Sequence, residues 1–358
     1  MQVTESPNAT LENVKEYYGK ILGNSDDLKT GACCTIDALP AYQIEILKEI
    51  DDEILSKFYG CGSPIPPALE GRTVLDLGCG TGRDVYMVSK LVGENGFVIG
   101  LDMTDEQLEV ARRHVPTQME RFGFNKTNVD FRQGYIEDLK SAGIADNSVD
   151  LVISNCVINL SPDKPRVFEE IFRVLKPGGE LYFSDVFCDR RVPTHVKSDP
   201  VVYGECLGGA LYTEDFRRMM LRLGAQDIRS VKRSPVEVND PAIKRVTGNI
   251  TFESITYRVF KLDNLEDLCE DYGQVAIYRG TIPECQHAFE LDDHHLFETG
   301  KPMTVCGNTA AMLQDTFYTD HFQILGDRSV HYGLFDCGPT PGAVGDGASA
   351  AACGPGCC

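Results

Sequence analysis

The chain has 358 residues, a hydrophobic fraction of 42% and a formal net charge of −20 at pH 7. The apolar fraction is enough for a packed core, whereas the negative charge argues against a nucleic acid partner, because phosphates need lysine and arginine to neutralise them. The sequence has no run of about 18 apolar residues that would predict a transmembrane helix, and its first residues lack the basic and apolar regions of a signal peptide. We therefore expect a cytoplasmic protein with no membrane partner, and we expect it to be a monomer.

The first part of the chain, residues 1–70, is predicted to form a helical cap with a cysteine loop. Residues 10–22 have the pattern of an amphipathic helix, and a polar loop with Cys33 and Cys34 follows it. A second helix is expected over residues 42–57. The chain has 14 cysteines, and in a reducing cytosol such cysteines more often bind metals or act in catalysis than form structural disulfides.

The segment Thr73–Asp84 combines a short buried strand, a turn with three glycines and the start of an apolar helix. Glycines let a ligand approach the main chain without meeting a Cβ atom. The next strand, residues 97–101, ends at Asp102, at the separation of about 20 residues that places a carboxylate on a ribose hydroxyl in a doubly wound sheet. Asp76 and Asp84 would repel a pyrophosphate but suit a ligand with an ammonium and a sulfonium group. The segment therefore predicts a site for a nucleoside-like cofactor.

Strands and helices alternate regularly from residue 73 to about residue 187, which favours an α/β fold with a doubly wound, seven-stranded, mostly parallel sheet. Residues 71–225 are predicted to be the cofactor-binding domain. The expected strands cover residues 73–77, 97–101, 128–132, 149–154 and 179–187, and the expected helices cover residues 83–92, 104–122, 164–175 and 195–223.

The rest of the chain is predicted to complete the sheet and to add a small domain. Residues 226–282 contain three expected strands (226–238, 254–262 and 274–278), some of which should form an antiparallel edge of the sheet. Residues 283–335 have a mixed pattern that indicates a small α+β domain. Residues 336–358 are rich in glycine and alanine and nearly uncharged, so we expect a disordered tail with cysteines.

Four cysteine positions suggest a binding role, and one of them is the early loop with Cys33 and Cys34. Cys156 comes directly after the strand at residues 149–154, at the edge of a sheet where ligands bind. Cys206 has small residues around it on a predicted helix, and Cys61 has a glycine on each side. For Cys156 alone, a buried apolar filler is the simpler interpretation, but the three together favour a shared site.

The positions of the remaining cysteines give less indication of a function. Five of them have no informative spacing and are expected to be structural or surface residues, namely Cys188, Cys269, Cys285, Cys306 and Cys337. A structural zinc site is not expected, because no suitable cysteine pairs with short spacing occur in the predicted ordered regions.

The motif segments around Asp76, Cys156 and Cys206 contain no histidine. The pattern Asp-x-Gly-x-Gly-x-Gly at residues 76–82 resembles the first motif of class I S-adenosylmethionine-dependent methyltransferases. Methyl transfer to oxygen or nitrogen usually requires a general base, so the absence of histidine suggests an acceptor with a lone pair of its own. Trivalent arsenic bound by thiolates is such an acceptor, because thiolates select soft centres and binding drives their deprotonation.

Several segments together resemble the arsenite S-adenosylmethionine methyltransferases, a family of class I, Rossmann-like methyltransferases. The resemblance extends from about residue 10 to residue 280. It rests on the segments Asp27–Cys34, Tyr59–Gly62, Asp76–Asp84, Gly100–Thr104, Ser154–Leu160 and Gly204–Tyr212.

The resemblance implies an enzyme that methylates arsenite with S-adenosylmethionine, as in arsenic detoxification. Cys156 and Cys206 would hold the arsenic, and Cys61 would supply a third thiolate or join a disulfide. Either Cys33 or Cys34 would pair with Cys61 during turnover, and a thiol reductant such as thioredoxin or glutathione would restore the thiols.

The same resemblance implies a set of cofactor-binding residues. In it, Asp102 would bind the ribose, and the glycine turn would face the methionine part. The set is Tyr59, Asp76, Gly78, Cys79, Gly80, Thr81, Gly82, Asp102, Met103, Ile136, Glu137 and Asn155.

Three alternatives stay open from the sequence. The tail cysteines Cys353, Cys357 and Cys358 resemble metalloid-capturing tails of the family, or they are thiols in a disordered end. The chain could also be a class I methyltransferase of a small organic acceptor. A third hypothesis is a metalloid-sequestering protein without catalysis.

Overall fold

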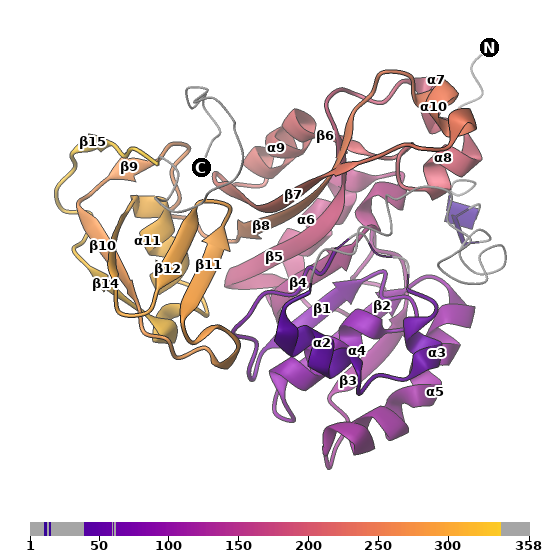
Figure 1. The fold of residues 1–358 in the computed structure, drawn as a ribbon, viewed down its shortest axis with the longest axis horizontal. Helices are drawn as coiled ribbons and strands as arrows, with labels where there is room; N and C mark the ends of the chain where they lie inside the picture. Colours follow the sequence, from indigo (N-terminus) through magenta and orange to yellow (C-terminus); the bar gives the residue numbers. More distant parts are fainter. Residues whose placement is uncertain (1–10, 13, 16–38, 59, 61, 338–358) are drawn as a thin grey trace.

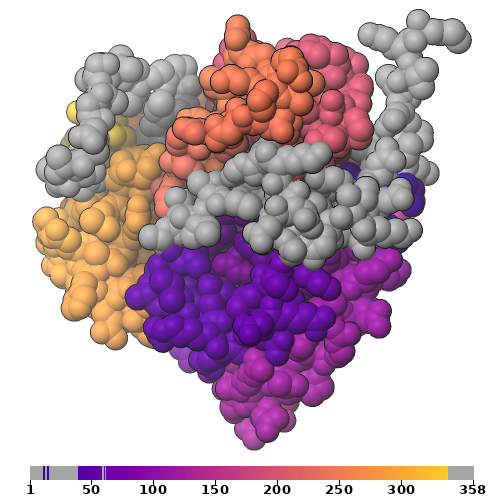
Figure 2. Space-filling model, turned by 45° about the vertical axis from the view of Figure 1, so that its right-hand side comes forward, coloured from indigo at the N-terminus to yellow at the C-terminus, as the bar shows by residue number. Residues whose placement is uncertain are grey.

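The computed structural model describes residues 11–12, 14–15, 39–58, 60 and 62–337. Figure 1 shows two parts, an α/β domain around a long twisted sheet and a smaller α+β unit, orange to yellow, at one end of that sheet. In the space-filling view of Figure 2 the smaller unit forms a lobe at the left of the α/β domain. The division into a large domain and a small C-terminal one is thus visible in the described part of the chain.

The central sheet consists of β1 (Thr73–Leu77), β2 (Phe97–Asp102), β3 (Val129–Gln133), β4 (Val149–Asn155), β5 (Leu175–Cys188), β6 (Leu211–Tyr212), β7 (Ile228–Val236) and β8 (Phe252–Phe260). Seven strands follow the order β3-β2-β1-β4-β5-β8-β7, and β6 pairs with β5 as an eighth. The pairings from β3 to β5 are parallel, whereas β8 is antiparallel to both of its neighbours. The predicted fold class is confirmed, with the two-residue β6 added to the seven expected strands. The strand order reverses between β1 and β4, where doubly wound sheets form a binding crevice.

Helices cover both faces of the central sheet (Figure 1). They are α2 (Ala41–Leu47), α3 (Asp52–Leu55), α4 (Arg83–Val92), α5 (Asp105–Phe122), α6 (Lys164–Val174) and α9 (Thr213–Arg222). Helices α2 to α5 contribute to one apolar cluster, and α6 and α9 contribute to another on the opposite face. The single helix expected over residues 42–57 is two short helices, α2 and α3.

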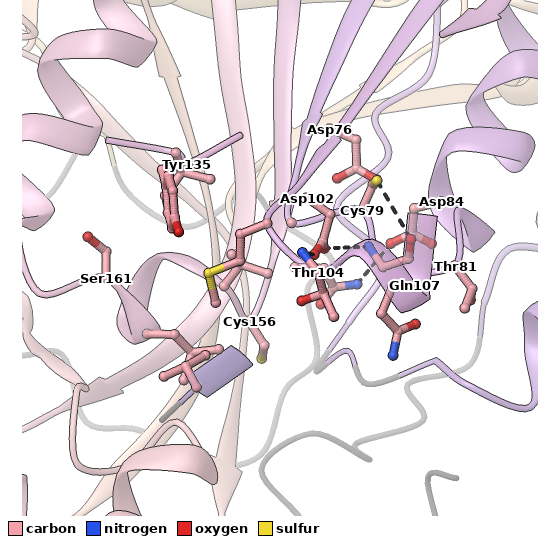
Figure 3. A pocket seen from close by; sticks show the side chains of 18 of the residues that line it. Asp76, Cys79, Thr81, Asp84, Asp102, Thr104, Gln107, Tyr135, Cys156 and Ser161 are labelled. Carbon is pink, nitrogen blue, oxygen red and sulfur yellow. Dashed lines mark hydrogen bonds between the residues drawn. The ribbon is translucent and has the colours of Figure 1, made fainter. Parts of the chain in front are cut away.

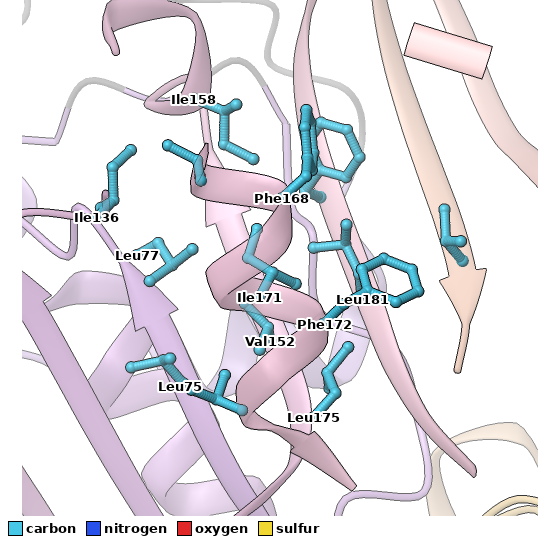
Figure 4. Packing of buried hydrophobic residues seen from close by; sticks show 14 of the residues in the cluster. Leu75, Leu77, Ile136, Val152, Ile158, Phe168, Ile171, Phe172, Leu175 and Leu181 are labelled. Carbon is cyan, nitrogen blue, oxygen red and sulfur yellow. The ribbon is translucent and has the colours of Figure 1, made fainter. Parts of the chain in front are cut away.

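Helix α6 shows how the core positions the carboxyl edge of the sheet. Its residues Phe168 and Ile171 are one turn apart and therefore lie on the same face. In Figure 4 they pack over Val152 of β4 and Leu181 of β5, and all four side chains are fully buried. Burying a side chain of this size contributes about 1.5–3 kcal/mol, so this packing fixes the connection between β4 and α6, which contains Cys156.

Residues 195–223 do not form the single helix predicted from the sequence. They are divided into α7 (Thr194–Lys197), α8 (Pro200–Gly204), β6 and α9. The Gly208–Gly209 pair lies in the interruption, and each glycine costs about 1 kcal/mol relative to alanine within a helix. Cys206 therefore lies in a turn with a φ of 64°, and its predicted place on a helix was wrong. The next helix, α10, connects β7 to β8 and covers Pro241–Thr247.

The smaller unit has its own apolar core, which includes Tyr278, Phe289 and Phe297. The strand expected over residues 274–278 belongs to a three-stranded sheet of this unit and not to the central sheet. The elements are β9 (Glu270–Asp271), β10 (Gln274–Tyr278), β11 (Ala288–Asp292), β12 (His295–Glu298), β13 (Pro302–Val305), α11 (Gly307–Gln314), β14 (Phe322–Leu325) and β15 (Gly333–Leu334).

A buried charge network fastens the smaller unit to the central sheet. Arg258 of β8 is 1% exposed and donates to Glu180 Oε1 of β5 over 2.7 Å. The same guanidinium donates to the Leu291 carbonyl in β11 and to the Tyr318 hydroxyl. Because one cation satisfies groups from both parts, the two parts are held in a fixed arrangement.

Candidate active site

A cavity opens at the carboxyl ends of β1, β2 and β4, where the strand order reverses. It contains about 990 Å³ of empty space, part of which is open to solvent. Figure 3 shows Asp76, Cys79 and Asp102 on one side of this cavity and Cys156 and Ser161 on the other. The cavity thus lies between the predicted cofactor residues and one of the predicted arsenic ligands.

The glycine turn after β1 forms one wall of the cavity. A Cβ atom on Gly78 would lie 2.4 Å from the Val157 side chain, so only glycine fits against the segment that follows β4. A Cβ atom on Gly80 would have no protein atom nearer than 4.0 Å among the described residues and would project into open space. Gly82 has a different role, because its Cβ would meet the Phe131 ring at 2.8 Å where α4 packs on the sheet. The turn therefore leaves the main chain at Gly80 accessible to a ligand.

Buried carboxyl groups line the cavity, where carrying a negative charge is costly. Burial raises the pKa of Asp76 well above its usual value, and the nearby Asp84 and Asp102 raise it further. Burial also raises the pKa of Asp102, against the effect of backbone hydrogen bonds. Its Oδ2 accepts from the Gly80 N–H over 2.9 Å and its Oδ1 accepts from the Thr104 N–H over 2.8 Å (Figure 3). A cationic ligand would offset the cost of this charge.

Asp84 is held from two sides. Its Oδ2 accepts from the Asn155 amide over 3.1 Å, and its Oδ1 lies 3.5 Å from Nη1 of Arg83. The Arg83 guanidinium also lies over the Phe58 ring, 3.7 Å from its centre. The amide of Asn155 donates to the Gly62 carbonyl as well, over 2.9 Å. Asp84 and Asn155 thus connect the start of α4, the end of β4 and the segment before β1.

The segment after β3 supplies the third wall. Ile136 and Glu137 line the cavity together with Met103. The Glu137 carboxylate accepts a short hydrogen bond from the Ser161 hydroxyl, and its Oε2 is buried without a hydrogen-bond partner among the described residues. Apolar side chains beside an unsatisfied acceptor suit a ring with N–H or O–H groups, such as a nucleoside.

The structure brings Cys156 and Cys206 together. The Cys206 thiol donates a hydrogen bond to the Cys156 carbonyl over 3.3 Å, and Cys206 and Cys156 are 0% and 2% exposed respectively. The φ angles of Cys156 and Cys206, 57° and 64°, are in the left-handed region, which is rare outside glycine and concentrates at functional sites. Cys156 also lines the cavity with the glycine turn. The two predicted ligands therefore lie side by side at the edge of the cofactor cavity.

The redox state of the cysteines bears on what they can bind. Cys156 is disulfide-bonded in this structure, so its sulfur becomes a ligand only after reduction. Cys33, Cys34, Tyr59 and Cys61 lie outside the described residues.

Cys79 is buried in the glycine turn. Its thiol donates to the Gly80 carbonyl over 3.8 Å, and burial raises its pKa well above the usual value. It is therefore a poor thiolate in this position. Thr81, the remaining predicted residue of the turn, donates its hydroxyl to the Ile54 carbonyl over 3.0 Å and lines the cavity.

Several polar groups around the cysteines were missed in the sequence. Asp185 of β5 accepts from both the backbone and the side-chain amide of Asn159, over 3.0 Å and 2.7 Å. Burial raises the pKa of Asp185 to about 7. Lys164 at the start of α6 is half-buried, and the loss of water around it lowers its pKa to about 8, although Asp185 and Cys206 act in the opposite direction. The only sequence signal for Asp185 was its place near the carboxyl end of an expected strand.

Fold and cavity define a class I methyltransferase, and a family model described as a methyltransferase domain matches residues 69–224. A second family model, described as the arsenite methyltransferase C-terminal domain, matches residues 272–332. An arsenite methyltransferase of Aquipseudomonas alcaligenes is 55% identical over 91% of this chain and 94% of that protein. The arsenite methyltransferase of Mus musculus is 43% identical over 90% of this chain and 85% of that protein.

A solved structure gives the same result. The crystal structure of an arsenic(III) S-adenosylmethionine methyltransferase from Chlamydomonas reinhardtii covers 84% of this chain and all of that one, with 53% identity and a TM-score of 0.81. The chain belongs to the arsenite methyltransferase family, so the resemblance of the motifs is confirmed. The cofactor of this class is S-adenosylmethionine, and the acidic, partly apolar cavity with its open glycine turn fits it.

Proposed function

We propose that this chain transfers methyl groups from S-adenosylmethionine to trivalent arsenic held by cysteine sulfurs. The observation that carries the proposal is the contact of Cys206 with Cys156, 3.3 Å from sulfur to carbonyl oxygen, beside the cofactor cavity. When bound, S-adenosylmethionine supplies a methyl group on a positively charged sulfur. The residues of the chain bind, orient and shield the two reactants.

Different walls of the cavity would hold different parts of the cofactor. Asp102 would accept from ribose hydroxyls, since each of its oxygens has a lone pair beyond the backbone bonds. Met103 and Ile136 would enclose the adenine with apolar surface. The main chain at Gly80 would receive the methionine part, and Asp76 would offer negative charge to its cationic groups.

Cys156 and Cys206 would act as thiolate ligands of arsenic, with Cys61 as the third. Three sulfur ligands leave one lone pair on the arsenic atom, and no proton has to be removed from such an acceptor. This agrees with the cavity wall, in which none of the described residues is a histidine. Holding donor and acceptor in an in-line geometry can lower the barrier by up to about 7–11 kcal/mol.

Each catalytic cycle would need the cysteines in reduced form. Reduction of the disulfide at Cys156 requires two electrons, and we propose that a thiol system such as thioredoxin or glutathione supplies them.

Within the described residues, no helix combines the length and apolarity that crossing a membrane requires. The cytoplasmic location and the monomeric state stay predictions.

The test compares cysteine variants of the full chain, incubated with labelled S-adenosylmethionine, arsenite and a thiol. Cys156→Ser and Cys206→Ser should each abolish every round of arsenic methylation. Cys188→Ser is the matched control, because Cys188 is also buried and only donates to backbone carbonyls, as a serine hydroxyl can. Wild-type rates in the first two variants would overturn the assignment.

This assay and a measurement of cofactor binding distinguish the two other hypotheses. A methyltransferase of a small organic acceptor would turn over without thiol and would not respond to Cys206→Ser. A protein that only sequesters arsenic would not bind S-adenosylmethionine in equilibrium dialysis.

A further inference from the structure

A second group of cysteines lies in the smaller unit, outside the cavity described above. The sulfur atoms of Cys269, Cys306 and Cys337 are all within 4.8 Å of one another. Cys269 and Cys306 are buried, and Cys337 is half-buried. None of the three lines the cofactor cavity, so methyl transfer as proposed does not account for them.

Strand pairing brings two of the three cysteines, Cys269 and Cys337, close together. Strands β9 and β15 are antiparallel, with Asp271 opposite Gly333. The Phe335 N–H then donates to the Cys269 carbonyl over 2.8 Å, which continues the pairing beyond the strand ends. Cys337 follows two residues later and therefore lies beside Cys269.

Cys306 comes from a third segment, between β13 and α11. Val305 pairs with Gln274 at the start of β10, which places the end of β13 next to β9. Cys306 is the N-cap of α11, where its sulfur accepts from the Thr309 N–H over 3.4 Å. Three separate backbone segments thus fix the positions of the three sulfur atoms.

The size of the group suits a single bound atom. A central atom with bonds of about 2.3 Å to sulfur holds its ligand sulfurs about 3.8 Å apart in a tetrahedral site. The separations in this group, up to 4.8 Å, need only a small adjustment to reach that value. Sulfur ligands select soft centres such as copper(I), zinc and trivalent arsenic.

The described residues of the group offer three sulfur ligands, the number that trivalent arsenic binds. The Arg229 guanidinium is fully buried, is paired with Asp227 and Asp292, and donates to the Cys306 sulfur over 3.9 Å. Arsenic bound by three thiolates is neutral and complete with three ligands.

We propose that Cys269, Cys306 and Cys337 form a second arsenic(III) site in the smaller unit, distinct from the methyl transfer site. Cys269 is disulfide-bonded in this structure, so a thiol or phosphine first reduces that bond with two electrons. Three thiols then react with arsenous acid, forming three As–S bonds and releasing three water molecules. The arsenic keeps its +3 oxidation state, and the site binds arsenic without methylating it.

The test measures arsenic bound by the full chain with the other arsenic-binding thiols removed. The background variant has serine at Cys33, Cys34, Cys61, Cys156, Cys206, Cys353, Cys357 and Cys358. It is reduced with a phosphine, which does not compete for arsenite as a dithiol would, then mixed with arsenite and desalted. Elemental mass spectrometry gives the bound arsenic per chain, and X-ray absorption counts its sulfur neighbours.

We expect one arsenic per chain with three sulfur neighbours. Adding Cys306→Ser should weaken binding at least tenfold, and the serine keeps the N-cap hydrogen bond, so the fold is preserved. Cys337→Ser should act in the same way. Cys285→Ser, in the same unit but outside the group, should change nothing.

Three results would overturn the proposal. They are unchanged arsenic binding after Cys306→Ser, arsenic with only two sulfur neighbours, and stoichiometric zinc binding by a protein that takes up no arsenite. The readout is binding in a chain that lacks Cys156 and Cys206. Failure of this second site is therefore distinct from failure of the proposed methyl transfer.

Discussion

Asp76 is a carboxyl group without access to bulk water, 3% exposed at the base of the cavity. Burial favours its neutral form, and the neighbouring Asp84 and Asp102 act in the same direction. An opposite charge in the cavity would reverse this preference, because it stabilises the ionised carboxylate. The protonation of one residue is thus linked to the binding of the cofactor.

We predict that S-adenosylmethionine binding releases a proton and that its affinity rises with pH. Below the pKa that Asp76 has in the free protein, the carboxyl is protonated, and a cationic ligand lowers that pKa. The gain is at most about 1.4 kcal/mol per pH unit for one proton, and it ends once Asp76 is ionised in the free protein. Calorimetry in two buffers with different ionisation heats measures the proton release.

The product S-adenosylhomocysteine provides the control, because it lacks the sulfonium charge and should release fewer protons. Asp76→Asn should remove the pH dependence of S-adenosylmethionine affinity below the pKa that Asp76 has in the free protein. An affinity that is constant or falls as the pH rises would contradict the linkage.

At the scale of elements, the site depends on the approach of two loops. A Cβ atom on Gly209 would lie 2.0 Å from the Asn159 carbonyl oxygen, so the turn after α8 touches the segment after β4 backbone to backbone. Asn159 is fixed in turn by its hydrogen bonds to Asp185. This contact keeps Cys206 next to Cys156.

Gly209→Ala should push the two loops apart, because a Cβ atom essentially never lies closer than 3.0 Å to such an atom. We expect arsenite affinity to fall at least tenfold, which corresponds to about 1.4 kcal/mol. Affinity for S-adenosylmethionine should stay close to the wild-type value. Equilibrium binding of both ligands to the reduced protein checks this.

Gly224→Ala is the control for general destabilisation. Gly224 has a φ of 87°, but a Cβ atom added there would have no neighbour within 4 Å among the described residues. Alanine therefore adds only backbone strain of about 1–2 kcal/mol. This variant should have a lower Tm and normal arsenite affinity. Equal loss of arsenite affinity in both variants would show that the loop contact is not responsible.

At the scale of the whole molecule, Arg258 joins the central sheet to the smaller unit. Its partner Glu180 is fully buried, and burial raises the pKa of that carboxyl while Arg258 lowers it. Removing a partner of a buried ion pair leaves an uncompensated charge, whereas replacing both partners is often nearly neutral.

Arg258→Met should therefore lower the free energy of unfolding by about 3–5 kcal/mol. The double variant Glu180→Gln with Arg258→Met should recover a large part of this loss. Urea unfolding at neutral pH measures both values. Two results would show that this ion pair does not stabilise the contact between the two parts. One is a single variant as stable as the wild type, and the other is a double variant with no higher free energy of unfolding than the single variant.

The sequence by itself determined the elements whose signals are local. The strand at 73–77 and the helix at 83–92 agree with β1 and α4 residue for residue. Their apolar spacing and the glycines between them act over a few residues, and the same short segment indicated the cofactor class. The family resemblance rested on segments of this kind.

Only the tertiary structure decided which distant segments meet. Cys206 leaves the expected helix because Gly209 contacts Asn159 in the loop after β4, and no local pattern encodes that contact. The strand at 274–278 joins the smaller unit, where it finds its partners, and Cys269, Cys306 and Cys337 meet through β9, β10 and their neighbours. Local periodicity fixes how a segment folds, whereas burial and hydrogen bonds between remote segments fix where it lies.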